Sequence, residues 1–282
     1  MITCIPDRDI ERIIEEDVPY GDLTTHLLGI GSRSGQIVFS TREETTVCCS
    51  EEAARIFEKC GATVSSCIPS GTRLQPAIPF LVASGSVQAL QAGWKVALNL
   101  LEYASGVASR TQRIVEKCRN VNPALSVVTT RKSFPGTKKI VIKAITAGGA
   151  LPHRLGLSES VLVFKQHTAF FGGLAPFLDT VAELKLTARE TKIIIEAETN
   201  EEALLIARSG ADIVQLDKIT PAELAETVVA LRGVNPDLLI SAAGGINEAN
   251  AADYAGTGID IIVLSSVYFG KPSDVGVVIR PT

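Results

Sequence analysis

The chain has 282 residues, 46% of them hydrophobic and 21% charged, with a formal net charge of −4. This balance excludes an intrinsically disordered chain, and the length allows one large domain or two modest ones with a buried core. No apolar run approaches the ~18–20 residues that cross a bilayer, and the N-terminus turns acidic before a secretory signal could form, so we expect a cytoplasmic protein that does not bind membranes.

Residues 1–85 predict short helices that alternate with short strands. A helix begins near Asp7 or Asp9, either of which can cap it. The β-branched run 36–49 predicts strands that can pair as a hairpin. Ser50 then caps a helix that ends at Gly61. Two more strands are expected at 62–67 and 80–84. Units of this kind build a small α/β sandwich.

A long helical pattern covers residues 86–118, and we expect Gly93 and Gly106 to break it, because glycine is disfavoured inside helices. We place a domain boundary near Gly106. From Leu125 onward, six continuous Val/Ile/Leu runs alternate with helical patterns, which predicts a parallel sheet covered by helices. The expected strands are 125–130, 161–164, 192–197, 211–217, 237–242 and 259–264.

This rhythm of strands and helices predicts an α/β fold. Six strands in roughly 140 residues suit a small β/α barrel or an open doubly wound sheet, and the barrel is preferred. Residues 1–106 are expected to form an N-terminal α/β sandwich and 107–270 a β/α barrel of about six strands. Residues 271–282 remain as a C-terminal tail that can pack back on the sandwich.

Ionisable groups or a glycine pair directly follow five of the six expected strands. In a parallel β/α barrel these strand ends share one face, where active sites are built. Taken singly, each residue has a plain explanation, because polar residues commonly begin loops. Together they favour one site. The residues at the six strand ends are Arg131 and Lys132, Lys165 to His167, Glu196 and Glu198, Asp217 and Lys218, Gly244 and Gly245, and Ser265 and Ser266.

Positive charge is concentrated in one segment. Residues 131–165 carry seven basic side chains and one acidic one, a net charge of +6 in a chain whose total is −4. An acidic protein with such a cluster most often binds a small anion. Nucleic acid is not expected, because the segment lacks interleaved aromatic residues. Arg131 offers a bidentate fork to a carboxylate or phosphate, and Lys132 a point charge beside it.

Two carboxylates and a glycine pair complete the predicted site. Glu196 and Asp217 can hold Mg²⁺ or sugar hydroxyls and can stabilise positive charge that develops on a sugar; a structural salt bridge to a nearby lysine is the alternative. Gly244 and Gly245 precede a helix expected to begin at Asn247, whose N-terminus can hold a phosphate, or they make only a tight turn. Together, the basic residues, the two carboxylates and the glycine pair suit transfer of a phosphorylated sugar.

Seven segments occur in an order that is specific to one family. They are EDVPYGDLTT (16–25), LNLLEYASGVAS (98–109), TTRKSFPGTK (129–138), GGALPHRLGLSE (148–159), EAETNEEAL (196–204), GADIVQLD (210–217) and AGGINEANAADYAGTGID (243–260). In these segments the chain resembles the quinolinate (nicotinate-nucleotide) phosphoribosyltransferases. The resemblance implies a sandwich followed by an open-seamed β/α barrel, as in type II phosphoribosyltransferases. It also implies a homodimer, able to assemble further, in which one subunit's sandwich closes the other's barrel.

The resemblance implies a reaction and assigns roles to residues. Quinolinate and phosphoribosyl pyrophosphate (PRPP) would give nicotinate mononucleotide, CO₂ and pyrophosphate, with Mg²⁺. The catalytic positions, of which the two acids lie near the ribose and Mg²⁺, are Lys132, Glu196 and Asp217. The substrate-binding T-R and H-R positions and the 5′-phosphate loop are Thr130, Arg131, His153, Arg154, Gly244 and Gly245.

The chain departs from the family pattern at several positions expected to contact substrate. Lys95 replaces an arginine that reaches into the neighbouring subunit's site, and Phe164 takes the place of a lysine, with Lys165 one step on. The other altered positions are Lys218, Ser241, Ala243 and Ser265. An Arg-to-Lys change removes bidentate recognition, and Phe164 exchanges a charge for an apolar wall. The phosphoribosyl end is therefore expected to be retained and the acceptor end altered.

Three hypotheses follow. The favoured one is a phosphoribosyltransferase (pyrophosphorylase) that transfers phosphoribose from PRPP to a small heteroaromatic or anionic acceptor other than quinolinate. The first alternative is a true carboxylating quinolinate enzyme of NAD biosynthesis, in which Lys165 replaces the missing lysine. The second is a non-catalytic anion-binding protein of molybdenum metabolism, because the altered pattern resembles a ModD-type branch of the family that is associated with molybdate-transport genes.

Overall fold

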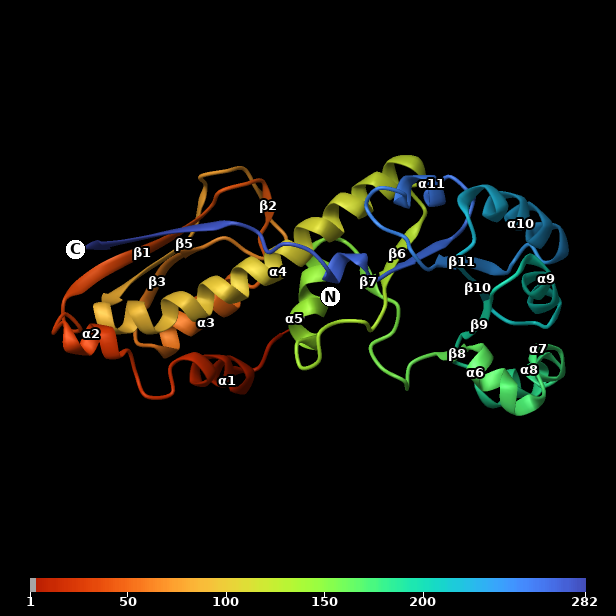
Figure 1. Ribbon diagram of the computed structural model, residues 1–282, viewed down its shortest axis with the longest axis horizontal. Coiled ribbons are helices and arrows are strands. Elements are labelled where there is room, and N and C mark those ends of the chain that lie inside the picture. The colour runs from red at the N-terminus through yellow and green to blue at the C-terminus, as the bar shows by residue number, and fades with distance from the viewer. Residues whose placement is uncertain (1–3) are drawn as a thin grey trace. The chain divides into compact units, whose positions relative to one another are not determined.

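The computed structural model describes residues 4–282, which form two compact units (Figure 1). Unit 1 contains the described residues up to Gln112 together with Ser133–Gly149 and Val267–Thr282. Unit 2 contains Arg113–Lys132 and Ala150–Ser266. The units are interleaved along the chain. The expected consecutive division into 1–106, 107–270 and 271–282 stays a prediction.

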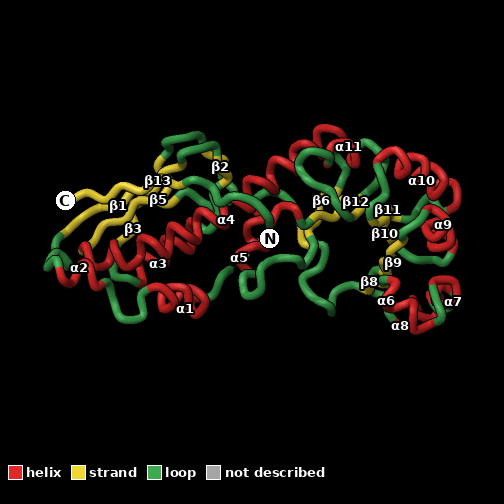
Figure 2. The backbone as a smooth tube through the Cα atoms, viewed as in Figure 1, coloured by secondary structure: helices red, strands yellow, loops and turns green. Residues whose placement is uncertain are grey.

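Unit 1 is built on a four-stranded antiparallel sheet with the order β13-β1-β5-β3 (Figure 2). Its strands are β1 (Ser34–Thr41), β3 (Thr63–Cys67), β5 (Pro79–Ser86) and β13 (Val275–Pro281). Burial alternates along β1, as a strand with one face on a core requires. Because β1 pairs with β5 and β13 on its two edges, the predicted hairpin within 36–49 is wrong. The second strand of that run, β2 (Thr45–Thr46), pairs instead with β4 (Arg73–Leu74).

The first two predicted helices exist, but their predicted caps are wrong. In α1 (Asp7–Asp17) the N-cap is Pro6 without a side-chain hydrogen bond, and the Asp7 carboxylate forms ion pairs with the neighbouring helix. In α3 (Ser50–Lys59) the N-cap is Cys49, with a left-handed φ of 61°. The hydroxyl of Ser50 is not a cap either. The end of α3 just before Gly61, whose φ is +93°, agrees with the prediction.

Helix α4 (Val87–Val121) runs for 35 residues without a break, so the breaks expected at Gly93 and Gly106 are wrong. The glycines serve close packing instead. A Cβ at position 93 would lie 2.9 Å from the ring of Phe57, and one at position 106 would lie 2.9 Å from the carbonyl oxygen of Lys271. Within residues 4–282, neither this helix nor any other is both long and apolar enough to cross a membrane.

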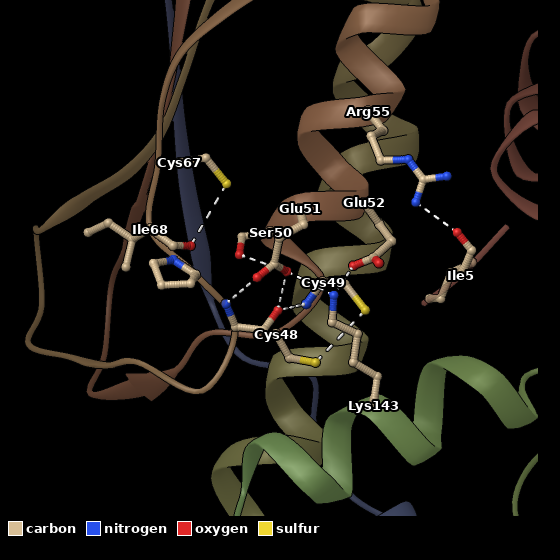
Figure 3. A network of polar contacts seen from close by, with 12 residues as sticks. Ile5, Cys48, Cys49, Ser50, Glu51, Glu52, Arg55, Cys67, Ile68 and Lys143 are labelled. Carbon is tan, nitrogen blue, oxygen red and sulfur yellow. Dashed lines mark hydrogen bonds and ion pairs between the residues drawn. The ribbon is translucent and has the colours of Figure 1, made fainter. Parts of the chain in front are cut away.

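A buried ion-pair network joins α5 (Lys138–Ala147) to the first turn of α3 (Figure 3). Lys143 Nζ donates to Glu52 Oε2 at 2.5 Å and to Glu51 Oε2 at 2.8 Å, and the Lys143 side chain is only 7% exposed. Burial alone would raise the pKa of Glu51, but hydrogen bonds from Lys143 and Ser70 lower it to about 2. The network anchors α5 within unit 1.

Unit 2 is a seven-stranded, all-parallel sheet with the order β7-β6-β12-β11-β10-β9-β8. Six strands are those expected: β6 (Ser126–Thr129), β8 (Val161–Val163), β9 (Ile193–Ala197), β10 (Ile213–Asp217), β11 (Leu239–Ala243) and β12 (Ile261–Leu264). The seventh, β7 (Leu151–Pro152), is too short to recognise by pattern. Because β7 and β8 are the two ends of the strand order, the sheet stays open there. The predicted α/β class with an open-seamed barrel is confirmed.

Helices cover the outer side of this curved sheet (Figure 2). They include α9 (Asn200–Arg208), α10 (Pro221–Val234) and α11 (Ala251–Ala255). The remaining helices of the described residues are α2 (Leu23–Leu27), α6 (Lys165–Thr168), η1 (Ala169–Phe171), α7 (Leu174–Leu178), α8 (Val181–Thr187) and η2 (Ser266–Tyr268). Because all seven strands are parallel, their carboxyl ends lie at one edge of the sheet.

Candidate active site

A cavity of about 560 Å³ lies at the carboxyl ends of the unit 2 strands, and every residue that lines it belongs to unit 2. Thirteen of the residues predicted for the site line this one cavity. They are Thr130, Arg131, Lys132, His153, Arg154, Phe164, Glu196, Asp217, Lys218, Ala243, Gly244, Gly245 and Ser265. The strands that these residues follow lie far apart in sequence, and the parallel sheet brings their carboxyl ends together.

Three predicted residues do not line the cavity. Lys95 is exposed on the part of α4 that belongs to unit 1, with Nζ 5.8 Å from the centroid of the Trp94 ring. Lys165 forms an ion pair with Glu198. Ser241 is buried in β11, where its hydroxyl donates to the carbonyl oxygen of Val214 at 3.2 Å. Their roles in substrate binding stay predictions.

The cationic side of the cavity follows β6 and β7. Arg131, Lys132 and Arg154 line it, and none of the three pairs with a carboxylate within residues 4–282. Burial and the neighbouring Arg131 lower the pKa of the Arg154 guanidinium below its ordinary value. Burial and the neighbouring Arg154 lower the pKa of His153. This edge therefore holds positive charge that lacks a neutralising partner, which is the electrostatic environment that favours an anionic ligand.

The acidic side follows β9 and β10. Burial, with the nearby charges of Asp217 and Glu198, raises the pKa of the half-buried Glu196, although a hydrogen bond from Gln215 Nε2 at 2.9 Å acts against this. Asp217 Oδ2 accepts a hydrogen bond from Lys218 Nζ at 2.6 Å. Within residues 4–282, Asp217 therefore has a lysine partner, whereas Glu196 has an amide partner and forms no ion pair with a lysine; the catalytic roles of both acids stay predictions.

The backbone has positive φ angles just after β10 and just after β11. Lys218 has a left-handed φ of 61°, which costs energy in a residue with a side chain and is frequent at functional sites. Its amide donates to the carbonyl oxygen of Ala243 at 2.8 Å. Gly244 and Gly245 follow with φ of +89° and +72°. The two glycines bring main chain to the cavity wall without side chains, as an anion-binding turn requires.

The helix expected to begin at Asn247 begins later, at Ala251, and is only five residues long. Asparagine side chains hold the intervening turn instead. Asn250 Oδ1 accepts from the amide of Asn247 at 2.8 Å, and Asn247 Oδ1 accepts from the amide of Ala249 at 2.9 Å. The predicted helix N-terminus at this loop is therefore wrong, and the glycine turn is the remaining candidate for holding a phosphate.

Sequence reasoning missed part of the cavity wall. The missed residues are Leu162, Gln215, Ile246, Val263 and Leu264. Leu162 and Gln215 each precede a predicted site residue by two positions, and Val263 precedes Ser265 in the same way. Because side chains two apart in a strand share a face, the alternation of the strands could have identified these three.

Comparison with known proteins gives matches over almost the whole chain. Family models for quinolinate phosphoribosyl transferase match residues 22–105 with its N-terminal domain and 107–275 with its C-terminal domain. A candidate pyrophosphorylase named ModD from Rhodobacter capsulatus is 45% identical over 250 residues, which are 88% of this chain and 95% of that protein. The nicotinate-nucleotide pyrophosphorylase [carboxylating] of Rattus norvegicus is 30% identical over 265 residues, 92% of this chain and 86% of that protein.

The fold has a close counterpart among solved structures. The nicotinate-nucleotide pyrophosphorylase from Francisella tularensis superposes with a TM-score of 0.88 and covers 99% of this chain and 99% of its own. At 22% sequence identity, this likeness establishes a shared fold and does not extend to substrates.

Proposed function

This chain belongs to the quinolinate phosphoribosyltransferase family of pentosyltransferases, and on that premise we propose that it transfers phosphoribose from PRPP to a small heteroaromatic or anionic acceptor other than quinolinate. The observation that carries the proposal is the pairing of charges around one cavity. Arg131, Lys132 and Arg154 line it as cations without carboxylate partners among residues 4–282, and Glu196 and Asp217 line the same cavity.

These groups suit the charges of the transfer. The cations bind the pyrophosphate, and the turn at Gly244 and Gly245 takes the 5′-phosphate. A lone pair of the acceptor forms a bond to C1′ of the ribose while the bond from C1′ to the pyrophosphate oxygen breaks, and pyrophosphate leaves with that electron pair. Positive charge develops on the ribose as the bond lengthens, and Glu196 and Asp217 stabilise it. Lys132 balances charge on the leaving pyrophosphate.

The donor set also fits Mg²⁺. This ion is commonly held by one or two carboxylates together with substrate phosphates. Glu196 and Asp217 offer two such carboxylates, and residues 4–282 contain no cluster of three or more metal-ligating side chains. We propose that the two acids hold Mg²⁺ largely through the bound PRPP, where the ion would neutralise charge on the departing pyrophosphate.

Phe164 supports an acceptor other than quinolinate. Phe164 lines the cavity, and the resemblance described above implies a lysine at its position. The adjacent Lys165 is paired with Glu198 and does not line the cavity, which supports an acceptor pocket without the missing charge. The carboxylating quinolinate enzyme remains the second candidate because a relative of that name is 30% identical to this chain.

We further propose a homodimer with shared active sites, able to assemble further. Four large apolar side chains within residues 20–28, on α2 or next to it in sequence, are exposed: Tyr20 (99%), Leu23 (68%), Leu27 (74%) and Leu28 (64%). Exposed apolar clusters of this kind commonly mark protein interfaces. Light scattering on the purified chain tests this, with a dimer or a multiple of two expected. A cytoplasmic location stays a prediction, supported by six unpaired cysteines.

The test is pyrophosphate release by the full chain with PRPP, Mg²⁺ and each of a panel of small heteroaromatic and anionic acceptors. We expect release with an acceptor other than quinolinate, and its loss in Arg154→Ala and Asp217→Asn. Lys185→Met is the control, because Lys185 is a unit 2 cation that pairs with Asp212 and does not line the cavity. Robust formation of nicotinate mononucleotide from quinolinate would favour the carboxylating enzyme. Absence of PRPP binding would favour a non-catalytic anion binder.

A further inference from the structure

One residue that lines the unit 2 cavity carries a buried hydrogen-bond acceptor for which residues 4–282 supply no donor. Gln215 is 4% exposed and lines the cavity. Its Nε2 donates to Glu196 Oε2 at 2.9 Å, which fixes the amide orientation because a carboxylate only accepts. Its Oε1 is buried and has no hydrogen-bond partner within residues 4–282. Native proteins leave few such atoms unpaired, so each one calls for an explanation.

The strand register places this glutamine in a polar row. Gln215 is paired with Glu196 of β9 on one side and with Ser241 of β11 on the other. One layer deeper the interior is apolar, with a cluster of Leu162, Ile194 and Ile213. The hydroxyl of Ser241 already donates to the main chain of β10. Within this row the carbonyl oxygen of Gln215 is therefore the acceptor that lacks a donor among residues 4–282, and Gln215 is also a residue that lines the cavity.

The neighbouring wall narrows the class of ligand. The pairing of Val163 with Ile195 places Phe164 beside Glu196 in the same row, and Phe164 lines the cavity. An aromatic side chain offers a flat apolar surface to a flat ring. A carboxylate placed here would face the oxygen of Gln215 and the carboxyl group of Glu196, both of which are acceptors or negatively charged. An uncharged ring with an N–H group is not repelled by Glu196 and can donate to the oxygen of Gln215.

We propose that Gln215 selects the acceptor: its Oε1 accepts a hydrogen bond from an exocyclic N–H of an uncharged heteroaromatic base whose ring lies against Phe164. This inference rests on the proposed phosphoribosyl transfer and names the acceptor class for it. A ring nitrogen of the base, turned toward C1′ of the ribose, remains free to form the new bond. The hydrogen bond from Gln215 Nε2 holds Glu196 in place at the same time.

The test uses two pairs of probes that differ by NH₂ against CH₃ and are nearly equal in size. These are nicotinamide with 3-acetylpyridine, and 3-aminopyridine with 3-methylpyridine. Calorimetric titration of the full chain, saturated with PRPP and Mg²⁺, gives the dissociation constants. We expect the N–H member of at least one pair to bind about tenfold more tightly than its methyl counterpart, as expected for a hydrogen bond to a buried acceptor, and more tightly than quinolinate.

The variant Gln215→Met removes the acceptor oxygen with little change in shape, and we expect the preference to fall to within about twofold. Gln91→Met is the matched control, because Gln91 lies on α4 in unit 1 and does not line the cavity. A preference that persists in Gln215→Met, equal or absent binding in both pairs of the unaltered chain, or tighter binding of quinolinate would each overturn the inference. The unaltered chain answers the question even if the variant fails to fold. Failure of PRPP itself to bind would instead overturn the proposed function.

Discussion

Asp217 and Gly244 approach so closely that a Cβ at position 244 would lie 2.6 Å from Asp217 Oδ1. The approach follows from strand pairing, because Asp217 is in register with Ala243 and the amide of Lys218 donates to the carbonyl oxygen of Ala243. The carboxylate proposed to face the ribose and the turn proposed to bind the 5′-phosphate are thus held next to each other by the same strand pairing.

Gly244→Ala is expected to displace the Asp217 carboxylate and to lower kcat/KM by about a hundredfold, because misplacing a catalytic group by 1 Å has that effect. Steady-state kinetics with PRPP measures it. Gly245→Ala is the matched control, since its φ is also positive but a Cβ there would meet nothing within 4 Å. If both variants lose activity equally, backbone strain is the cause and the contact with Asp217 is unimportant.

The loss of activity at low pH should reflect protonation of Glu196. Burial, with the charges of Asp217 and Glu198, raises its pKa, so its ionised form is lost at a higher pH than for an ordinary glutamate. kcat/KM should therefore fall as pH decreases through this raised pKa. Glu198→Gln removes one negative neighbour and should shift this loss to lower pH, whereas Gln215→Met removes a hydrogen bond that favours the ionised form and should shift it to higher pH. Shifts in the opposite directions would contradict the assignment.

Phe164→Lys should increase affinity for quinolinate about tenfold, because a charged hydrogen bond to a carboxylate replaces an apolar wall. Titration with quinolinate measures the change, and Phe164→Met controls for loss of the ring. Adding Lys95→Arg should strengthen binding further if dimers share their sites. No gain from Phe164→Lys would mean that the acceptor lies elsewhere.

Gly106→Ala should destabilise the chain by about 1–3 kcal/mol, because the new methyl group would meet main-chain atoms of Lys271 and Pro272 at 2.9–3.0 Å. Gly233→Ala, in α10 with nothing within 4 Å, should instead stabilise by about 0.5–1 kcal/mol through helix propensity. Urea unfolding monitored by circular dichroism compares them. Equal changes in both variants would show that packing at Gly106 has no special role.

The parallel sheet and the location of the site could be predicted from the sequence because their signals are local. Strands buried on both faces appear as continuous apolar runs, and residues at their carboxyl ends, such as Arg131 and Asp217, must share an edge of the sheet. The two-residue β7 could not be predicted, since so short a segment has no period.

Other features depend on contacts between distant parts of the chain. Gly93 and Gly106 look like helix breaks until Phe57 and Lys271 are seen to pack against them. The pairing of β13 with β1 joins segments more than two hundred residues apart. The role of Gln215 depends on which atoms of its amide are already bonded, which no sequence pattern records.

We propose that the cations and the acids of the unit 2 cavity bind PRPP together. Calorimetric titration of the full chain with PRPP in Mg²⁺ tests it most directly, comparing the unaltered chain with Asp217→Asn and Arg154→Ala. We expect saturable one-site binding in the unaltered chain that each substitution weakens at least about tenfold, as expected for loss of a charged partner. Undetectable binding in the unaltered chain, or equal affinity in all three proteins, would contradict it.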